Sequence, residues 1–153
     1  MFGLTFRQLL DLPPLWLALM LVAAWAQTIV LPGPEFGPWA RFAGTLLIAG
    51  GLVLIGLAFA EFRRADTSVV PHQEPRAILT SGIYRVSRNP IYLADLLLLA
   101  GFSLRWSAWL GLILVPVLAV ILTRRFILPE EDRLRAGFGP EFAQWASRTR
   151  RWL

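Results

Sequence analysis

Four apolar segments constrain what this chain of 153 residues can fold into. The first runs from about Pro14 to Leu31 and the second from Phe42 to Ala60, and neither contains a charged residue. The third begins at Pro90 and ends near Leu104, and the fourth covers Trp106 to Thr123. A helix as long as the second segment extends about 28 Å, which is close to one hydrocarbon core. We therefore expect an all-α integral membrane bundle of about four transmembrane helices, forming one domain over residues 1–153.

The composition agrees with a lipid-facing exterior and excludes several kinds of chemistry. Hydrophobic residues make up 56% of the chain and charged residues only 16%, which is too apolar for a soluble domain of this size. The chain has no cysteine and one histidine, so it has no disulfide scaffold, no thiolate site and no multi-histidine metal centre. All fifteen basic residues are arginine, which excludes Schiff-base and Walker-type lysine chemistry. We expect no bound metal.

The arginines are distributed unequally between the two sides that four spans would create. The amino terminus, the second loop and the tail share one side and hold thirteen of the fifteen, whereas the other side has only Arg41 and Arg105. Cytoplasmic loops are rich in arginine, so we expect both termini in the cytoplasm and an inner or plasma membrane location. Trp39, Trp106 and Trp109 fall where an aromatic belt would lie on the far side. The net charge of +5 indicates this orientation rather than binding to nucleic acid.

Glycines in the second span predict close helix packing. Gly44, Gly50, Gly51 and Gly56 follow no strand and precede no Lys-Ser/Thr pair, so they do not form a phosphate-binding loop. Gly56 and Ala60 have the small-xxx-small spacing that lets two membrane helices approach closely.

A cytoplasmic loop of about thirty residues, from Glu61 to Asn89, precedes the third span and is longer than a connector needs to be. Both tyrosines of the chain, Tyr84 and Tyr92, fall near its end. Asn89 is suited to an N-cap and Pro90 to a first helical turn, so the third span is expected to start here. Tyr92 then lies one turn in, at the membrane surface, as either an interfacial anchor or part of a site.

A second polar stretch follows the fourth span. Pro129 predicts a helix start, and the carboxylates of Glu130, Glu131 and Asp132 complement the positive end of the helix dipole. Such a start is also ordinary in a surface helix. A last short helix from Pro140, with arginines beyond it, predicts an amphipathic segment on an anionic leaflet.

These motifs, in this order, resemble the isoprenylcysteine carboxyl methyltransferase family, whose wider membrane clan includes phospholipid N-methyltransferases. The matching elements are Leu79-Thr80-Ser81-Gly82-Ile83-Tyr84, Arg88-Asn89-Pro90-Ile91-Tyr92, a hydrophobic hairpin, Glu130-Glu131 and Phe138-Gly139. The resemblance covers about Phe62 to Leu153. Enzymes of this family are integral membrane proteins that use S-adenosyl-L-methionine without a Rossmann domain. The resemblance therefore implies this cofactor.

Carried over position by position, the resemblance also implies site residues. The cofactor-binding candidates are Arg76, Ala77, Ile78, Leu79, Tyr84, Asn89, Pro90, Ile91, Tyr92, Glu130 and Glu131. Arg125 is the catalytic candidate, because an arginine would orient a carboxylate acceptor, which needs no general base near neutral pH. The implied acceptor is small or lipid-like and is methylated on a carboxyl, thiol or amine. It would enter from the bilayer.

Four positions depart from the family pattern or remain open. Asn89 replaces the histidine of eukaryotic members and cannot titrate, and Phe126 occupies the place where the family has an arginine. Asp95 lies within the third span, where an ionisable group is either functional or a structural acid. His72 lies in a proline-flanked loop and is expected to be solvated.

Two other functions are compatible with the sequence. Sterol-reductase-type membrane enzymes have a related carboxyl-terminal region and use a nicotinamide, but they have many more spans. A non-enzymatic membrane scaffold could use the arginine-rich face on lipid or on a partner.

Overall fold

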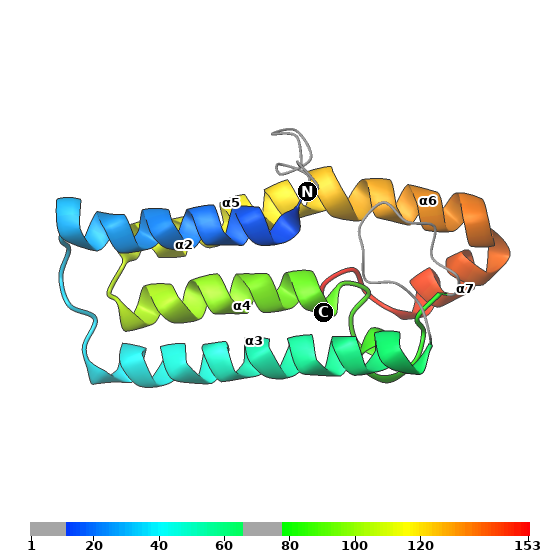
Figure 1. Cartoon of the computed structure of the whole chain (residues 1–153), viewed down its shortest axis with the longest axis horizontal. Coiled ribbons are helices and arrows are strands. Elements are labelled where there is room, and N and C mark those ends of the chain that lie inside the picture. The colour runs from blue at the N-terminus through cyan, green and yellow to red at the C-terminus, as the bar shows by residue number, and fades with distance from the viewer. Residues whose placement is uncertain (1–11, 66–77) are drawn as a thin grey trace, which may run out of the picture.

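The computed structural model describes residues 12–65 and 78–153, and in this part of the chain four long helices form a bundle in which each runs antiparallel to the one before it (Figure 1). They are α2 (Pro13–Val30), α3 (Pro38–Arg64), α4 (Pro90–Arg105) and α5 (Trp109–Leu122). α4 packs against the other three, and α2 also packs against α5. The expected all-α membrane bundle is confirmed.

The helix boundaries lie close to the expected segments. Pro13, Pro38 and Pro90 each stand in the first turn of their helix, where the missing proline N–H costs nothing. α2, α3 and the helix that begins at Trp109 are long and apolar enough to cross a membrane. α4 has 16 residues, or about 24 Å, which is less than a ~30 Å hydrocarbon core. This short helix lies between α3 on one side and α2 and α5 on the other (Figure 1).

Two helix backbones touch where α3 crosses α4. A Cβ placed on Gly44 would lie 2.5 Å from the carbonyl oxygen of Gly101, and one on Gly51 would lie 3.1 Å from that of Ala94. The packing expected of the glycines therefore occurs at Gly44 and Gly51. Gly56 is exposed, with no atom near its missing side chain, so the expectation was wrong for that position.

A π turn joins the fourth span directly to the helix that was expected to start at Pro129. Thr123–Ile127 forms a single π-helical segment in which the Leu128 N–H donates to the Thr123 oxygen, five residues back. α6 (Leu128–Phe138) continues from it directly and carries Pro129 in its first turn. Proline cannot donate to the preceding turn and its ring crowds that turn, so the wider π turn absorbs the misfit without a break. As a result, α6 extends α5 beyond the bundle (Figure 1).

The chain then folds back over the end of the bundle. Gly139, with φ of +49°, reverses the chain before α7 (Pro140–Arg148), where a short helix was expected. Beyond α7 the Arg88 N–H donates to the Arg150 oxygen at 3.0 Å. The 3-10 helix η1 (Gly82–Arg85), the start of α4, α6, α7 and the carboxyl terminus therefore gather at one end (Figure 1).

Candidate functional site

The two polar stretches separated by the α4–α5 hairpin meet at Tyr92 and Glu130. The Tyr92 hydroxyl donates to Glu130 Oε2 at 3.3 Å, although the residues are 38 positions apart in sequence. Tyr92 lies in the first turn of α4 and Glu130 in the first turn of α6. The Tyr92 ring also packs against Phe126 of the π turn, with 6.3 Å between centroids. The hairpin and the π turn thus place a tyrosine beside an exposed carboxylate at the end of the bundle.

Tyr84 is the second tyrosine at this end of the bundle. It is 7% exposed, and its ring meets Phe62 edge-on with centroids 6.0 Å apart. The Trp145 indole N–H donates to the Tyr84 carbonyl at 3.1 Å, which fixes the 3-10 turn against α7. Burial and the negative charges of Glu130 and Glu61 raise the pKa of the Tyr84 hydroxyl above its usual value. Tyr84 therefore stays neutral between the two carboxylates.

Glu61 also lies at the site, although the sequence does not mark it as a candidate. Its side chain is buried, accepts a hydrogen bond from the Ser81 hydroxyl and pairs with Arg64 at 2.9 Å. Gly82 has φ of +54° and leaves no space for a Cβ beside the Glu61 carboxylate. Glu61 was expected to begin the cytoplasmic loop, whereas α3 continues through it to Arg64. A carboxylate near the end of an apolar span was the one available signal.

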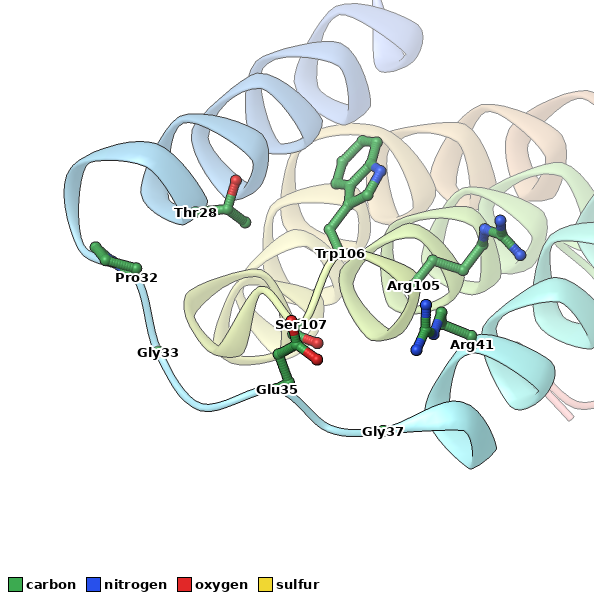
Figure 2. A pocket seen from close by; sticks show the side chains of 9 residues that line it. All are labelled: Thr28, Pro32, Gly33, Glu35, Gly37, Arg41, Arg105, Trp106 and Ser107. Atoms are coloured by element: carbon green, nitrogen blue, oxygen red, sulfur yellow. The ribbon is translucent and has the colours of Figure 1, made fainter.

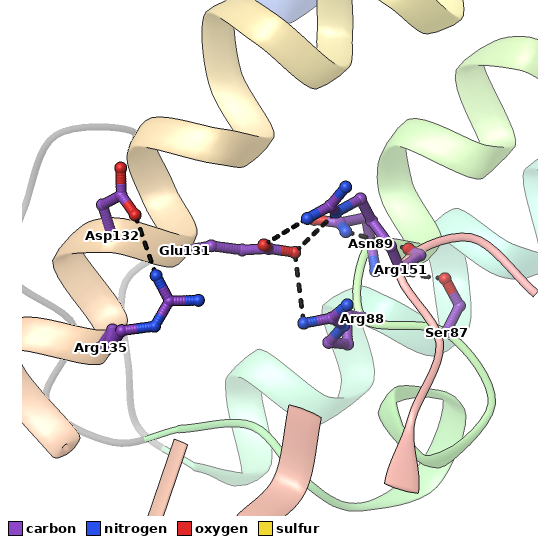
Figure 3. A network of polar contacts seen from close by, with 7 residues as sticks. All are labelled: Ser87, Arg88, Asn89, Glu131, Asp132, Arg135 and Arg151. Atoms are coloured by element: carbon purple, nitrogen blue, oxygen red, sulfur yellow. Dashed lines mark hydrogen bonds and ion pairs between the residues drawn. The ribbon is translucent and has the colours of Figure 1, made fainter. Parts of the chain in front are cut away.

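Glu131 points into a group of arginines (Figure 3). Its carboxylate oxygens accept hydrogen bonds from Arg151 Nε at 3.0 Å and from Arg151 Nη2 at 2.8 Å, and Arg88 Nη1 lies 3.3 Å from Glu131 Oε1. The carboxylate is largely buried. Burial alone would raise the pKa of Glu131, but the hydrogen bonds from Arg151 and the charge of Arg88 outweigh it and hold the pKa below its usual value. This ion cluster joins α6 to the start of α4 and to the carboxyl-terminal residues.

Asn89 belongs to the same junction. Its side-chain amide donates to the Arg151 carbonyl at 3.0 Å, and its backbone N–H donates to the Ser87 hydroxyl at 3.1 Å (Figure 3). The side chain makes no capping bond to α4, although a capping role was expected. Asn89 instead connects the start of α4 to the tail. A role for Asn89 or Glu131 in cofactor binding stays a prediction.

The remaining predicted wall residues are apolar. Leu79 is buried against Ala58 and Tyr84, and Ile91 packs on the same cluster. Pro90 is buried and Ile78 is half-buried. Two other candidates, Arg76 and Ala77, lie outside the described residues, as does His72.

Arg125 lies on the α2 side of the π turn. Its side chain is exposed, and its guanidinium lies over the Trp16 ring, 5.6 Å from the centroid. The neighbouring Phe126 is the residue of the turn that packs against Tyr92. Catalytic use of Arg125 stays a prediction.

Asp95 lies one turn deeper than Tyr92 on α4. It is 6% exposed and faces the interior of the bundle. Within the described residues its carboxylate makes no hydrogen bond or ion pair. A buried carboxylate without a partner is costly, and in membrane helices it usually marks a functional position.

The candidate site is thus a rim formed by Tyr84, Tyr92 and the exposed carboxylate of Glu130 at one end of a helical membrane bundle. Leu79 and Ile91 form its apolar walls. Residues 39–141 match the phospholipid methyltransferase family. The chain therefore belongs to this family, which is part of the isoprenylcysteine carboxyl methyltransferase-like group of membrane methyltransferases.

A curated relative extends the similarity over most of the chain. The cobalt-zinc-cadmium resistance protein CzcN of Cupriavidus metallidurans is 32% identical over 127 residues, which are 80% of this chain. The match spans 57% of the length of that relative. Within the described residues of this chain, no group of three or more His, Asp or Glu side chains is placed to hold a metal ion. No solved structure matches the chain.

Proposed function

We propose that this protein is an S-adenosylmethionine-dependent methyltransferase that acts on a small or lipid-like acceptor. The observation that carries the proposal is the contact between Tyr92 and Glu130, because it joins the two stretches on which the family resemblance rests. Membership of the phospholipid methyltransferase family supports the reaction class.

The residues at this end of the bundle fit the chemistry of the cofactor. S-adenosylmethionine supplies a methyl group on a positively charged sulfur, and it also carries an amine, a carboxylate, a ribose and an adenine. An exposed carboxylate such as Glu130 can accept hydrogen bonds from the ribose hydroxyls or the amine. Ile91, which is partly exposed, provides apolar surface for an adenine, and the buried side chains of Tyr84 and Leu79 pack behind it.

Each residue of the rim has a distinct role in this proposal. Tyr92 fixes the orientation of the Glu130 carboxylate through its hydroxyl. Glu130 is an exposed carboxylate whose negative charge attracts a cationic ligand, whereas Glu61 is buried, pairs with Arg64 and supports the turn that carries Tyr84. Holding donor and acceptor in one orientation supplies much of the rate of a methyl transfer, so rigid walls are the main contribution required of the protein.

The acceptor reaches this end of the bundle from the bilayer. The halves of α2 and α3 nearest this end expose large apolar side chains to lipid, including Leu19, Leu57 and Phe59. We place the site at the cytoplasmic face of an inner or plasma membrane, because thirteen of fifteen arginines fall on that side of the four spans. Carboxyl, thiol and amine groups all remain possible attacking groups.

Cofactor binding by purified protein in detergent tests the proposal. Calorimetric titration with S-adenosylmethionine should give saturable binding, and Tyr92→Phe and Glu130→Gln should each weaken it about three- to tenfold, the effect of one lost hydrogen bond. Glu141→Gln is the matched control, because Glu141 is an exposed carboxylate in the first turn of α7. Circular dichroism verifies that each variant keeps its helices.

Two outcomes would contradict the proposal. Equal affinities of wild type, Tyr92→Phe and Glu130→Gln for S-adenosylmethionine would show that the cofactor does not bind at Tyr92 and Glu130. Saturable binding of a nicotinamide dinucleotide, without binding of S-adenosylmethionine, would replace the reaction with the reductase alternative. Transfer of a labelled methyl group into a lipid and metabolite extract, followed by mass identification, then names the acceptor.

A further inference from the structure

A polar cavity lies at the end of the bundle opposite to Tyr92 and Glu130. It has a volume of about 280 Å³ and lies between the α2–α3 loop and the α4–α5 turn (Figure 2). Its lining residues are Thr28, Pro32, Gly33, Glu35, Gly37, Arg41, Arg105, Trp106 and Ser107. The site proposed for methyl transfer does not use any of them.

The cavity brings together the two arginines that the described part of the chain has at this end of the bundle. Arg41 comes from the first turn of α3 and Arg105 ends α4, and both side chains lie on the α3–α4 side of the cavity (Figure 2). Among the described residues, the Arg41 guanidinium forms no hydrogen bond or ion pair, and that of Arg105 donates only to the Thr45 hydroxyl, at 2.5 Å. Two neighbouring cations without a carboxylate partner favour an anion between them.

The walls of the cavity are held in a fixed shape. Ser107 has φ of +55°, and it is the only non-glycine residue with a positive φ in the described ranges. Its hydroxyl accepts the Phe36 N–H at 3.1 Å and so ties the α4–α5 turn to the α2–α3 loop. Gly33 packs so closely on Trp109 that an added Cβ would lie 2.6 Å from the indole ring. Backbone strain of this kind concentrates at ligand clamps and other functional sites.

The charges of the cavity select among anions. Glu35 lines the cavity and forms no ion pair with either arginine in the described part of the chain. One negative charge beside two positive ones favours a singly charged phosphodiester over phosphate groups that carry close to two charges. Trp39, Trp106 and Trp109 at this end indicate the depth of lipid headgroups.

We propose that this cavity binds a phosphodiester, supplied by the headgroup of a phospholipid in the leaflet opposite the candidate methyltransferase site. Arg41 and Arg105 hold the phosphate oxygens, and Glu35 excludes more highly charged anions. The proposal is independent of the methyltransferase assignment, because it uses other residues at the other end of the helices.

Native mass spectrometry of protein in a non-ionic detergent tests it with three probes: short-chain phosphatidylglycerol, the matching diacylglycerol and inorganic phosphate. Wild type should retain phosphatidylglycerol about tenfold more strongly than Arg41→Gln or the double variant Arg41→Gln/Arg105→Gln, with no difference for diacylglycerol. Arg63→Gln is the control, because it removes the same charge from the opposite end of α3 and should bind as wild type does. Arg41 makes no side-chain bond in the described structure, so the single variant tests binding without disturbing the fold.

Displacement of phosphatidylglycerol by inorganic phosphate at millimolar concentration would overturn the assignment to a lipid headgroup and point to a soluble phosphate instead. Equal retention of phosphatidylglycerol by wild type and both Arg41 variants would overturn the phosphate site altogether. Stronger binding of inorganic phosphate by Glu35→Gln, with binding of phosphatidylglycerol preserved, would support the selective role of Glu35.

Discussion

Arg151 donates two hydrogen bonds to the Glu131 carboxylate, from Nη2 at 2.8 Å and from Nε at 3.0 Å. This two-point contact is the strongest geometry available to an arginine and a carboxylate. With Arg88 on the same carboxylate, it fastens the tail of the chain and the start of α4 to α6. The relative positions of Tyr92 and Glu130 therefore depend on an ion cluster beside them.

Removing Glu131 should destabilise the protein. Glu131→Ala leaves Arg88 largely buried without its carboxylate, and we expect a loss of about 2 kcal/mol, which is less than for a fully buried pair because Arg151 is partly exposed. Unfolding in detergent followed by circular dichroism measures this loss. Asp132→Ala is the control, because its pair with Arg135 is exposed on both sides and should be worth at most about 0.5 kcal/mol. Equal losses in the two variants would argue against the cluster.

The same carboxylate should make stability depend on pH. The pKa of Glu131 is lower in the folded protein than its ordinary value of 4.5, so the unfolded state binds more protons between these two values. The stabilisation by Glu131 is thus fully present above about pH 5 and is lost as the pH falls through the folded pKa. Melting temperatures between pH 3 and 6 should fall toward acid more steeply in wild type than in Glu131→Gln. Parallel curves would mean that Glu131 has no lowered pKa.

Much of the fold could be predicted from the sequence, because its signals are local. Uncharged apolar runs define the spans, and Pro13, Pro38 and Pro90 open helices whatever packs against them. The partners of Glu131 could not be predicted, because Arg151 reaches it only after α7 turns the chain back. Glu61 was missed for a similar reason, since its hydrogen bond comes from Ser81, twenty residues further along the chain.

The π turn at Thr123–Ile127 was the other feature that the sequence concealed. Pro129 correctly indicated the first turn of α6, but a proline after a span is compatible both with a break and with a widened turn. Which of the two forms depends on what packs against Phe126 and Ile127, and both are buried in the structure. Contacts with residues distant in sequence cannot be predicted from the local sequence pattern.

Gly82 should be intolerant of any side chain. Its φ of +54° is strained for alanine, and a Cβ would collide with the Glu61 carboxylate. We expect Gly82→Ala to cost more than about 1 kcal/mol and to weaken cofactor binding, because Tyr84 lies in the same 3-10 turn. Gly137→Ala, within α6 and facing open space, provides the comparison and should be neutral or slightly stabilising. Thermal unfolding and the calorimetric titration measure both effects, and tolerance of alanine at Gly82 would mean that this turn rearranges freely.

Asp95 should show opposite effects on stability and function. A carboxylate that is 6% exposed among apolar helices, without a partner in the described structure, costs folding free energy that a leucine would recover. We expect Asp95→Leu to raise stability by about 1–2 kcal/mol and to reduce labelled methyl transfer at least tenfold, because Asp95 lies one turn below Tyr92. Ser103→Ala, further along the buried face of the same helix, is the control and should leave methyl transfer unchanged. The Ser103 hydroxyl only donates a hydrogen bond to the Leu99 carbonyl of its own helix. A lower stability of Asp95→Leu would show that the carboxylate has a stabilising partner, and unchanged methyl transfer would remove Asp95 from the reaction.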